Sequence, residues 1–318
     1  MPILRKTSFS GYQHICQIAA DRGALFYSTA DFLVFFTIFS IKAAKAKISV
    51  LAFCIMLNHF HLGAYFHDVR QMESFMNGLT SSHARIYNRH YGRTGQVYKT
   101  PYKNSPKSSD KLIRCNLAYT GNNPVEKSAV SKAEDYRWNF IKYMESDHPF
   151  SRPFDPVSAS GSMLTLMKKV SRMYENGQFI DYSFFDKQYE SLSEDEKNQI
   201  TDFIISKYNI IDKKRIMSKF GSYDTLIRFM SSMVGNEFDL ADDSSKEDYR
   251  HYSQMLDIAG REGFDIRKCW TEDQPIPEWL VRKFRREAGA SDYEIRKFTH
   301  GSFGPYKHSC KSCTRKTG

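Results

Sequence analysis

Two neighbouring apolar runs, residues 48–56 and 59–66, constrain the fold of this chain more than any other feature. A connection of only two residues separates them, so they are expected to form adjacent β-strands. Side chains on a strand alternate between its two faces, so His59 and His61 should point the same way. The large apolar residues between them should point the other way. The sequence therefore predicts a sheet with helices over its apolar face and histidines lining a cleft on the other.

Histidine pairs of this kind can bind one metal ion, but they also occur as packed strand residues or in other kinds of site. Further along the chain, Tyr119 and Asn123 are four residues apart, the spacing that shares one face of a helix. Asn123 precedes Pro124, and a residue before proline is biased away from helix, so the pair can also straddle a helix end or a kink. Two histidines, a tyrosine and a carboxamide could hold a divalent cation on a phosphate and attack it with a phenol oxygen. This combination indicates DNA-breaking chemistry.

The order of predicted elements around these motifs indicates an α+β fold. The pattern predicts a strand, a helix, two strands, a helix, a strand and then a helix that carries Tyr119. This is the ferredoxin-like order, an antiparallel sheet covered by helices. The predicted ranges, in chain order, are 11–19, 29–45, 48–56, 59–66, 70–91, 95–103 and a helix from about residue 108.

The charge of the chain favours a polyanionic partner. The 318 residues carry a formal net charge of +10, and residues 83–114 hold eight Lys/Arg against one acidic residue, with tyrosines between them. Cations neutralise phosphates and aromatic faces stack on unpaired bases, so this segment is predicted to contact single-stranded or hairpin DNA. The alternative is an ordinary solvated surface rich in cations. The predicted contact residues are Arg85, Arg89, Arg93, Tyr98, Lys99, Tyr102 and Lys103.

The second half of the chain has helical periodicity and little strand pattern. Two domains are therefore expected, an α+β domain over residues 1–150 and an all-α region over residues 151–318. The helical segments are residues 163–174, 193–208, 213–233 and 246–262.

Near the end, residues 276–300 predict a helix, a glycine-containing turn and a second helix, followed by a basic tail over residues 301–318. Such a pair can place a helix in a DNA groove, but an ordinary helical hairpin with a basic face has the same pattern. The predicted DNA contacts here are Arg282, Arg285 and Arg286.

The cysteine pattern and the longest apolar run bear on the compartment. The six cysteines are scattered, mostly in apolar segments, which predicts reduced thiols in a cytoplasmic protein. Cys310 and Cys313 form a lone C-x-x-C without a second pair, so a zinc site is not expected there. The run over residues 32–41 is too short to span a bilayer, which takes about 20 apolar residues. It predicts a core helix, and no membrane association is expected.

These motifs match a known family in several ordered blocks. Met56-Leu-Asn-His-Phe-His-Leu62 resembles the Met-Pro-Asn-His-hydrophobe-His-Leu block of the single-tyrosine transposases of the HUH superfamily. The REP-associated tyrosine transposases are the most similar branch. The similarity runs through residues 75–98, 119–130 and 136–138, and so extends over residues 8–145. The chain departs from the family at Leu57, where proline is usual, and at the Gly121–Asn122 pair, where bulkier residues are common.

The resemblance implies a metal-dependent transposase that cleaves and rejoins single-stranded DNA near hairpins through a 5′-phosphotyrosine intermediate. Tyr119 would be the nucleophile, and His59, His61 and Asn123 would bind Mg²⁺ or Mn²⁺. The helix–turn–helix pattern near the end resembles one appended to some family members. Related enzymes act as monomers or homodimers. Two alternatives stay open: a domesticated or inactive hairpin-binding protein, and a metal-dependent nuclease that uses water while Tyr119 is structural.

Overall fold

The computed structural model describes residues 10–20, 23–234, 249–271 and 274–300. The chain divides into two compact units, residues 1–250 and 251–318. The domain boundary predicted between residues 150 and 151 stays a prediction, and in the structure elements from both sides of it pack together within the first unit.

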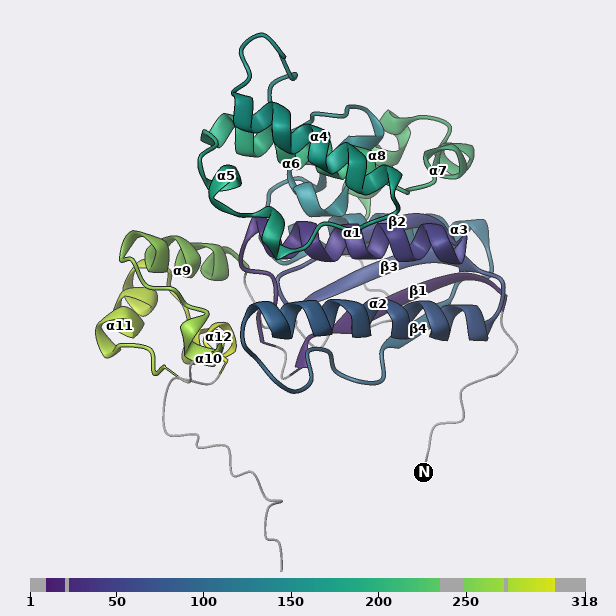
Figure 1. The fold of residues 1–318 in the computed structure, drawn as a ribbon. Coiled ribbons are helices and arrows are strands. Elements are labelled where there is room, and N and C mark those ends of the chain that lie inside the picture. The colour runs from purple at the N-terminus through teal and green to yellow at the C-terminus, as the bar shows by residue number, and fades with distance from the viewer. Residues whose placement is uncertain (1–9, 21–22, 235–248, 272–273, 301–318) are drawn as a thin grey trace, which may run out of the picture. The chain divides into compact units, whose positions relative to one another are not determined.

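A four-stranded antiparallel sheet forms the centre of the first unit (Figure 1). Its strands are β1 (Gly11–Ile18), β2 (Ser49–Ile55), β3 (His59–Phe66) and β4 (Lys103–Pro106), in the spatial order β2-β3-β1-β4. This arrangement confirms the predicted α+β class and its ferredoxin-like order. The last strand is shorter and begins later than the predicted 95–103. Gly95 adopts positive φ, so the backbone turns where an extended strand was expected to begin.

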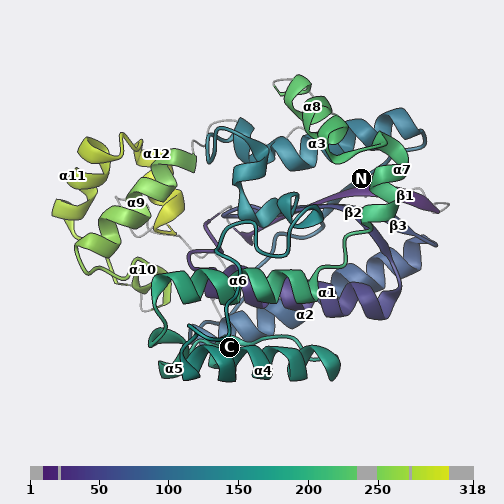
Figure 2. The same cartoon turned by 90° about the horizontal axis from the view of Figure 1, so that it is seen from above.

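Helices cover both faces of this sheet. α1 (Thr29–Ala46) and α2 (Val69–His90) lie on one side and α3 (Asp110–Glu126) on the other, as Figure 2 shows from above. The alternation predicted for β3 holds. Phe60 faces α1, where its ring packs against Phe35 at 4.9 Å between ring centroids. His59 and His61 face α3 and are each 1% exposed.

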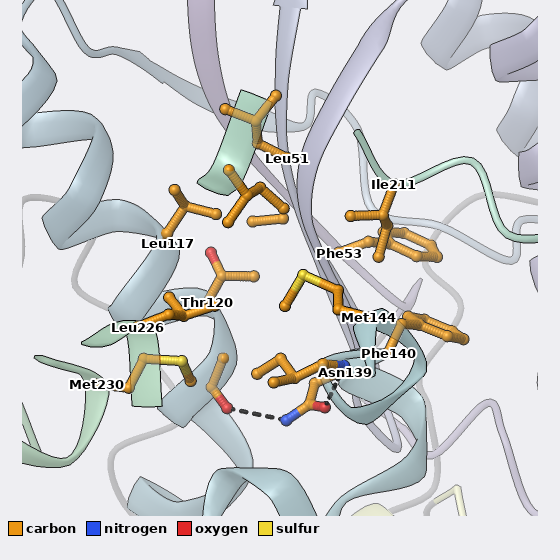
Figure 3. Close-up of a pocket in the computed structure, with 14 residues that line it drawn as sticks. Leu51, Phe53, Leu117, Thr120, Asn139, Phe140, Met144, Ile211, Leu226 and Met230 are labelled. Carbon is orange, nitrogen blue, oxygen red and sulfur yellow. Dashed lines mark hydrogen bonds between the residues drawn. The ribbon is translucent and has the colours of Figure 1, made fainter. Parts of the chain in front are cut away.

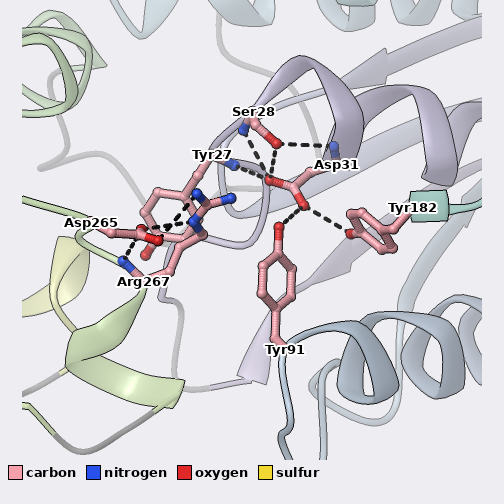
Figure 4. A network of polar contacts seen from close by, with 7 residues as sticks. All are labelled: Tyr27, Ser28, Asp31, Tyr91, Tyr182, Asp265 and Arg267. Carbon is pink, nitrogen blue, oxygen red and sulfur yellow. Dashed lines mark hydrogen bonds and ion pairs between the residues drawn. The ribbon is translucent and has the colours of Figure 1, made fainter. Parts of the chain in front are cut away.

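A buried carboxylate fixes the start of α1. Asp31 forms a capping box with Ser28, and it is fully buried. Its Oδ1 also accepts hydrogen bonds from the hydroxyl groups of Tyr91 (2.6 Å) and Tyr182 (2.8 Å), as Figure 4 shows. A buried charge is tolerated when hydrogen bonds satisfy it, so this network ties the residue-182 segment to the N-terminal part of the fold.

The rest of the first unit is helical. Its α-helices are α4 (Gly161–Glu175), α5 (Lys187–Glu190), α6 (Glu194–Tyr208), α7 (Lys213–Phe220) and α8 (Tyr223–Ser232). Short 3₁₀ helices lie between α3 and α4, namely η2 (Ala133–Asp135), η3 (Arg137–Asn139) and η4 (Lys142–Met144), and η5 (Tyr182–Phe184) lies between α4 and α5. One long helix over residues 213–233 was predicted. Gly221, with φ +81°, ends α7 and separates it from α8, because this conformation cannot continue a helix.

Helix α8 packs closely on α3. A side chain at Gly121 would place its Cβ 2.3 Å from the Met230 methyl group, so any larger residue would require the Met230 side chain to shift. The neighbouring Asn122 is buried and its Nδ2 donates to the Met230 carbonyl oxygen at 2.6 Å. Both departures from the family pattern in α3 therefore lie at its contact with α8.

The second unit is also helical. α9 (Tyr249–Arg261) begins in the last two residues of the first unit, and α10 (Lys268–Thr271), α11 (Glu278–Glu287) and α12 (Asp292–Phe298) follow. The predicted helix, turn and helix over residues 276–300 are present, with Gly289 at φ +65° between α11 and α12. The predicted basic tail, with Cys310 and Cys313, lies outside the described residues. In the described ranges, no helix combines the length and apolar character needed to cross a membrane.

Candidate active site

The histidine face of the sheet meets the middle of α3, and together they form a buried polar cluster. β3 contributes His59 and His61, and α3 contributes Tyr119 and Asn123. Pro124 lies inside α3, which continues to Glu126, so the predicted alternative of a helix end between Tyr119 and Asn123 is wrong. The two side chains share one helix face, as their spacing suggested.

Aromatic contacts bring the tyrosine ring to the histidines. The Tyr119 ring stands edge-on to His61, with 5.4 Å between ring centroids and 83° between planes. It makes a similar contact with His14 of β1 at 5.6 Å. Tyr119 is 6% exposed, so the packing of its ring holds the phenol group beside the imidazoles.

Hydrogen bonds define the orientation of His61. Its Nε2 lies 3.1 Å from Asn123 Nδ2, and its Nδ1 lies 3.1 Å from His14 Nε2. An amide nitrogen only donates, so His61 Nε2 accepts and the ring proton is on Nδ1, which donates to His14. This tautomer leaves the Nε2 lone pair directed towards Asn123.

The second ligand candidate has a separate set of contacts. His59 Nδ1 lies 2.7 Å from Asn58 Oδ1, and the Tyr249 hydroxyl donates to the same oxygen at 2.6 Å. The His59 and His61 rings are perpendicular, with 4.9 Å between centroids. Asn58 and Tyr249 are both 4% exposed, so this hydrogen-bonded group is buried with the histidines.

The donor atoms fit a divalent cation whose third ligand is an amide. Asn123 Oδ1 is buried, and no hydrogen bond to it is formed within the described part of the chain. A buried carbonyl oxygen without a partner is costly, and a cation would satisfy it. No cluster of three or more His, Cys, Asp or Glu side chains arranged as metal ligands occurs in the described ranges, so a site here needs the amide.

Next to the histidines, a tight packing contact closes the cluster. The Tyr12 hydroxyl of β1 donates to Asn116 Oδ1 of α3 at 2.7 Å, directly over Gly63 of β3. A Cβ on Gly63 would lie 1.9 Å from the Tyr12 oxygen. Burial raises the pKa of Tyr12 far above its usual value, so its phenol stays protonated and remains a donor. Gly63 thus allows α3 to approach the sheet closely.

The cavity behind α3 is a packing feature and not a substrate site. It encloses about 20 Å³ and is lined mainly by apolar side chains from β2, α3 and α8, including Leu51, Leu117 and Met230 (Figure 3). That volume is close to that of one water molecule. Leu117 and Gly121 line it from α3, whereas Tyr119 and Asn123 meet the histidines.

The predicted DNA contacts of the first unit differ in how far they are exposed. Arg85, Arg89, Lys99 and Lys103 are exposed, and Arg93 and Tyr102 are half-buried. Tyr98 does not fit the prediction. It is 4% exposed and its hydroxyl is hydrogen-bonded to His83 Nδ1 at 2.8 Å, so its ring is part of the core and cannot stack on a base.

In the second unit, all three predicted arginines are exposed, and each contacts an acidic side chain. Arg282 lies 3.4 Å from Glu278, Arg285 lies 2.9 Å from Asp292, and Arg286 lies 2.8 Å from Glu287. These acids reduce the positive potential of α11 and α12. The same helices expose two aromatic residues that the sequence analysis did not select, Trp279 and Tyr293.

Sequence reasoning also missed His14, Asn58 and Tyr249. Asn58 is adjacent to His59, and its place in the family block was the available signal. His14 lies on β1 opposite Gly63 in the register, but the sequence alone does not give that register. Tyr249 follows about 190 residues after His59, and nothing in the local pattern links the two.

Comparison with known proteins agrees with the sequence resemblance. Residues 7–112 match the sequence model of the family described as "Transposase IS200 like". This match includes both site histidines and ends before Tyr119 and Asn123. Over these residues the match agrees with the predicted resemblance to a transposase family.

A solved structure of a REP-associated tyrosine transposase bound to a REP hairpin is also similar. The two chains are 13% identical, and the match covers 51% of this chain and 92% of the other with a TM-score of 0.40. No curated protein matches this chain.

Proposed function

We propose that this protein is a transposase that cleaves and rejoins single-stranded DNA, with Tyr119 as the nucleophile. The observation that carries the proposal is the convergence of Tyr119, His61 and Asn123 in one buried cluster. A phenol beside two imidazoles and an amide oxygen is suited to nucleophilic attack on a phosphate held by a cation.

In the proposed reaction, the Tyr119 oxygen forms a bond to the scissile phosphorus and the bond from phosphorus to the 3′ oxygen breaks. The phenol loses its proton and the departing 3′ oxygen takes one up, which leaves a 5′-phosphotyrosine and a free 3′-hydroxyl. Attack by a 3′-hydroxyl on the phosphotyrosine reverses the step. The covalent link conserves the energy of the phosphodiester, so rejoining needs no nucleotide cofactor.

His59, His61 and Asn123 would hold a Mg²⁺ or Mn²⁺ ion. When bound, such an ion polarises a non-bridging phosphate oxygen and offsets negative charge in the transition state. Imidazole is a softer donor than Mg²⁺ prefers, which favours tolerance of Mn²⁺. His61 Nε2 accepts from Asn123 Nδ2 in this structure, so joint binding of an ion by these two residues would require the Asn123 amide to turn its oxygen towards the ion.

The exposed cations of residues 83–114 would contact the DNA backbone. Lys99 and Lys103 precede or begin β4, the edge strand that pairs with β1, the strand carrying His14. Arg85 and Arg89 are exposed on the last turns of α2. Cations on such a surface can neutralise successive phosphates of one strand. Single-stranded or hairpin DNA is the proposed partner, bound by a cytoplasmic monomer or homodimer.

Helices α11 and α12 would provide a second DNA contact. Arg282, Arg285 and Arg286 are exposed there, together with the aromatic rings of Trp279 and Tyr293. Because each arginine already contacts an acid, the contribution of this surface should be smaller than that of residues 83–114.

The test is a covalent trapping experiment with Tyr119→Phe. This change removes one oxygen and keeps the ring packing against His61, so folding and hairpin binding should be nearly unchanged. Labelled single-stranded substrate should give a covalent band after denaturation with the wild type and none with the variant. Mass spectrometry should locate the nucleotide on the peptide of residues 116–127.

Tyr208→Phe is the matched control, because it removes a buried phenol that donates to the Gln178 carbonyl oxygen, away from the site. It should retain the adduct. A persistent adduct in Tyr119→Phe, or attachment at another tyrosine, overturns the assignment. A free 5′-phosphate product without an adduct supports the water-using nuclease. Hairpin binding without any strand breakage supports the inactive binding protein.

A further inference from the structure

The outer helical layer of the first unit carries an open groove that the proposed reaction does not use. The groove is formed by α4, α6 and the loop before α4, and its volume is about 400 Å³. Half-buried apolar side chains line it, among them Leu164, Met167 and Phe203. It is far larger than the cavity behind α3, so it has room for several side chains of another segment.

The rim of this groove is mainly basic. Lys168 and Arg172 are exposed one helical turn apart on α4, and within the described ranges neither side chain forms an ion pair. The lining also includes one acid, Glu175, a further turn along the same helix. A groove with an apolar interior and an excess of positive charge fits an apolar segment that carries a negative charge.

The loop before α4 presents a segment with this chemistry. Val157 is 92% exposed at its tip, and Asp155 is exposed two residues earlier. The Val157 N–H donates to Asp155 Oδ1 at 3.0 Å, and this bond holds the pKa of the carboxyl group below its usual value. The carboxylate is therefore charged at neutral pH. Phe154, in the same loop, lines the groove, so loop and groove form one continuous surface.

Both ends of this loop are fixed to α6. Arg152 forms an ion pair with Asp195, and the Ser160 N–H donates to Glu196 Oε1 at 2.9 Å. Within the loop, the ring of Pro156 restricts the backbone next to the exposed tip. The tip is therefore held in place before any contact forms, which reduces the conformational entropy lost on binding.

We propose that this surface joins two copies of the chain, with the tip of each loop seated in the groove of the other copy. Val157 enters the apolar part of the groove, and Asp155 approaches Lys168 and Arg172. Because Phe154 joins loop and groove in one patch, the patch can be complementary to itself, as a two-fold dimer requires. Single exposed apolar residues are ordinary on a protein surface. Here the apolar tip, its charge and the adjacent groove match one another.

A dimer of this kind leaves the candidate active site open. α6 packs on α1 and α4 packs on α6, on the side of the sheet opposite α3 (Figure 2). Tyr119 and the histidines that it contacts lie on the α3 side. The two copies would carry separate sites, so the inference does not rest on the proposed function.

Sedimentation equilibrium of the full chain without DNA, over a broad concentration series, measures the association. The wild type should change from monomer to dimer as its concentration rises. Val157→Lys should raise the dissociation constant by about 100-fold or more, because two valine side chains lose their burial and two added cations meet a basic rim. Val234→Lys is the matched control, since it makes the same change at an exposed valine outside the groove lining, and it should leave the association unchanged.

A mixing experiment separates reciprocal exchange from other kinds of dimer. Met167→Lys places a charge in the groove and should also prevent association, while the apolar stem of lysine lets the fold persist, which circular dichroism checks. Arg172→Glu, at an exposed position, is a second groove variant that repels Asp155. A copy with Val157→Lys keeps an intact groove, and a copy with either groove variant keeps an intact loop. A mixture of the two should therefore associate more tightly than either variant alone.

A wild type that stays monomeric at every concentration overturns the inference. A dimer that Val157→Lys leaves unchanged also overturns it, because the two copies then meet elsewhere. A mixture that associates no better than the separate variants contradicts reciprocal exchange. If Val157→Lys instead lowers hairpin affinity without changing the association, the groove contacts DNA and not a second copy. Failure of the Tyr119→Phe trapping test would overturn the proposed function and leave this inference standing.

Discussion

Buried histidines lie against both faces of the sheet, and their neighbours differ. His83 of α2 is on the apolar face, where its ring contacts Phe26, Phe35 and Tyr98. Burial lowers its pKa to about 3, so it is a neutral core side chain. On the opposite face, His59 and His61 contact polar partners and a tyrosine. The comparison teaches that the neighbours of a buried histidine, and not its burial, indicate whether it is a candidate for a functional site.

The largest expected effect comes from removing the two histidines of the polar face. His59→Ala with His61→Ala should reduce strand cleavage by about 1,000-fold or more, because metal ligation contributes several kcal/mol to transition-state stabilisation. Hairpin affinity should change little, since exposed cations supply most of it. A gel assay of cleavage and a filter-binding assay check the two quantities. Strand breakage by the wild type that continues in excess chelator would contradict the metal role.

On the apolar face, we expect a substitution to lower stability and to leave metal binding unchanged. Phe60 lies between His59 and His61 on β3 but is fully buried against α1. Phe60→Ala should lower the free energy of unfolding by about 3–5 kcal/mol, as large-to-small core changes do. Denaturant titration measures this loss. At temperatures where the variant is folded, its Mn²⁺ affinity should equal that of the wild type, and a weakened affinity would show that the two faces are coupled.

A pH titration of stability tests the neutral histidine. The pKa of His83 is lowered from its usual 6.5 to about 3 in the folded protein. The unfolded chain therefore binds more protons between these values, and stability present above pH 6.5 should fall as the pH drops towards 3. His83→Phe should remove part of that pH dependence, on the order of a few kcal/mol.

The smallest effect concerns the two basic surfaces. If each lysine contacts one phosphate, Lys99→Ala with Lys103→Ala should reduce the slope of log affinity against log salt concentration. The expected reduction is about 1.4 for single strands and about 1.8 for duplexes. Replacing Arg282, Arg285 and Arg286 together should change the slope less per residue, because acids already pair with them. Affinity measured across a salt series decides this. An equal change in slope for each lysine and each arginine replaced would show that the arginines leave their acidic partners when DNA binds.

Periodicity predicted the elements that bury one face. The alternation of residues 59–66 placed Phe60 and His61 on opposite sides correctly, and the helix predicted over residues 29–45 agrees with α1. The family block supplied Tyr119 and Asn123, which the structure brings to His61. These features depend on residues close together in sequence, where side-chain spacing determines which face each residue occupies.

The long-range features could not be predicted in this way. Tyr98 looked like a stacking residue because it lies among cations, yet its hydrogen bond to His83 and its burial depend on how α2 packs. His14 and Tyr249 enter the site through strand register and through a contact about 190 residues away. A sequence pattern records periodicity and composition, whereas these contacts depend on tertiary packing.

The close approach of Gly121 to Met230 has a consequence for how this protein can vary. An alanine at residue 121 would require the Met230 side chain to shift, so it should be accepted most easily where residue 230 becomes smaller. The two positions would then change as a pair in descendants of this chain. An engineer who grafts the helix bearing Tyr119 onto another scaffold would have to carry α8 with it, or refill the space behind residue 121 with a larger side chain.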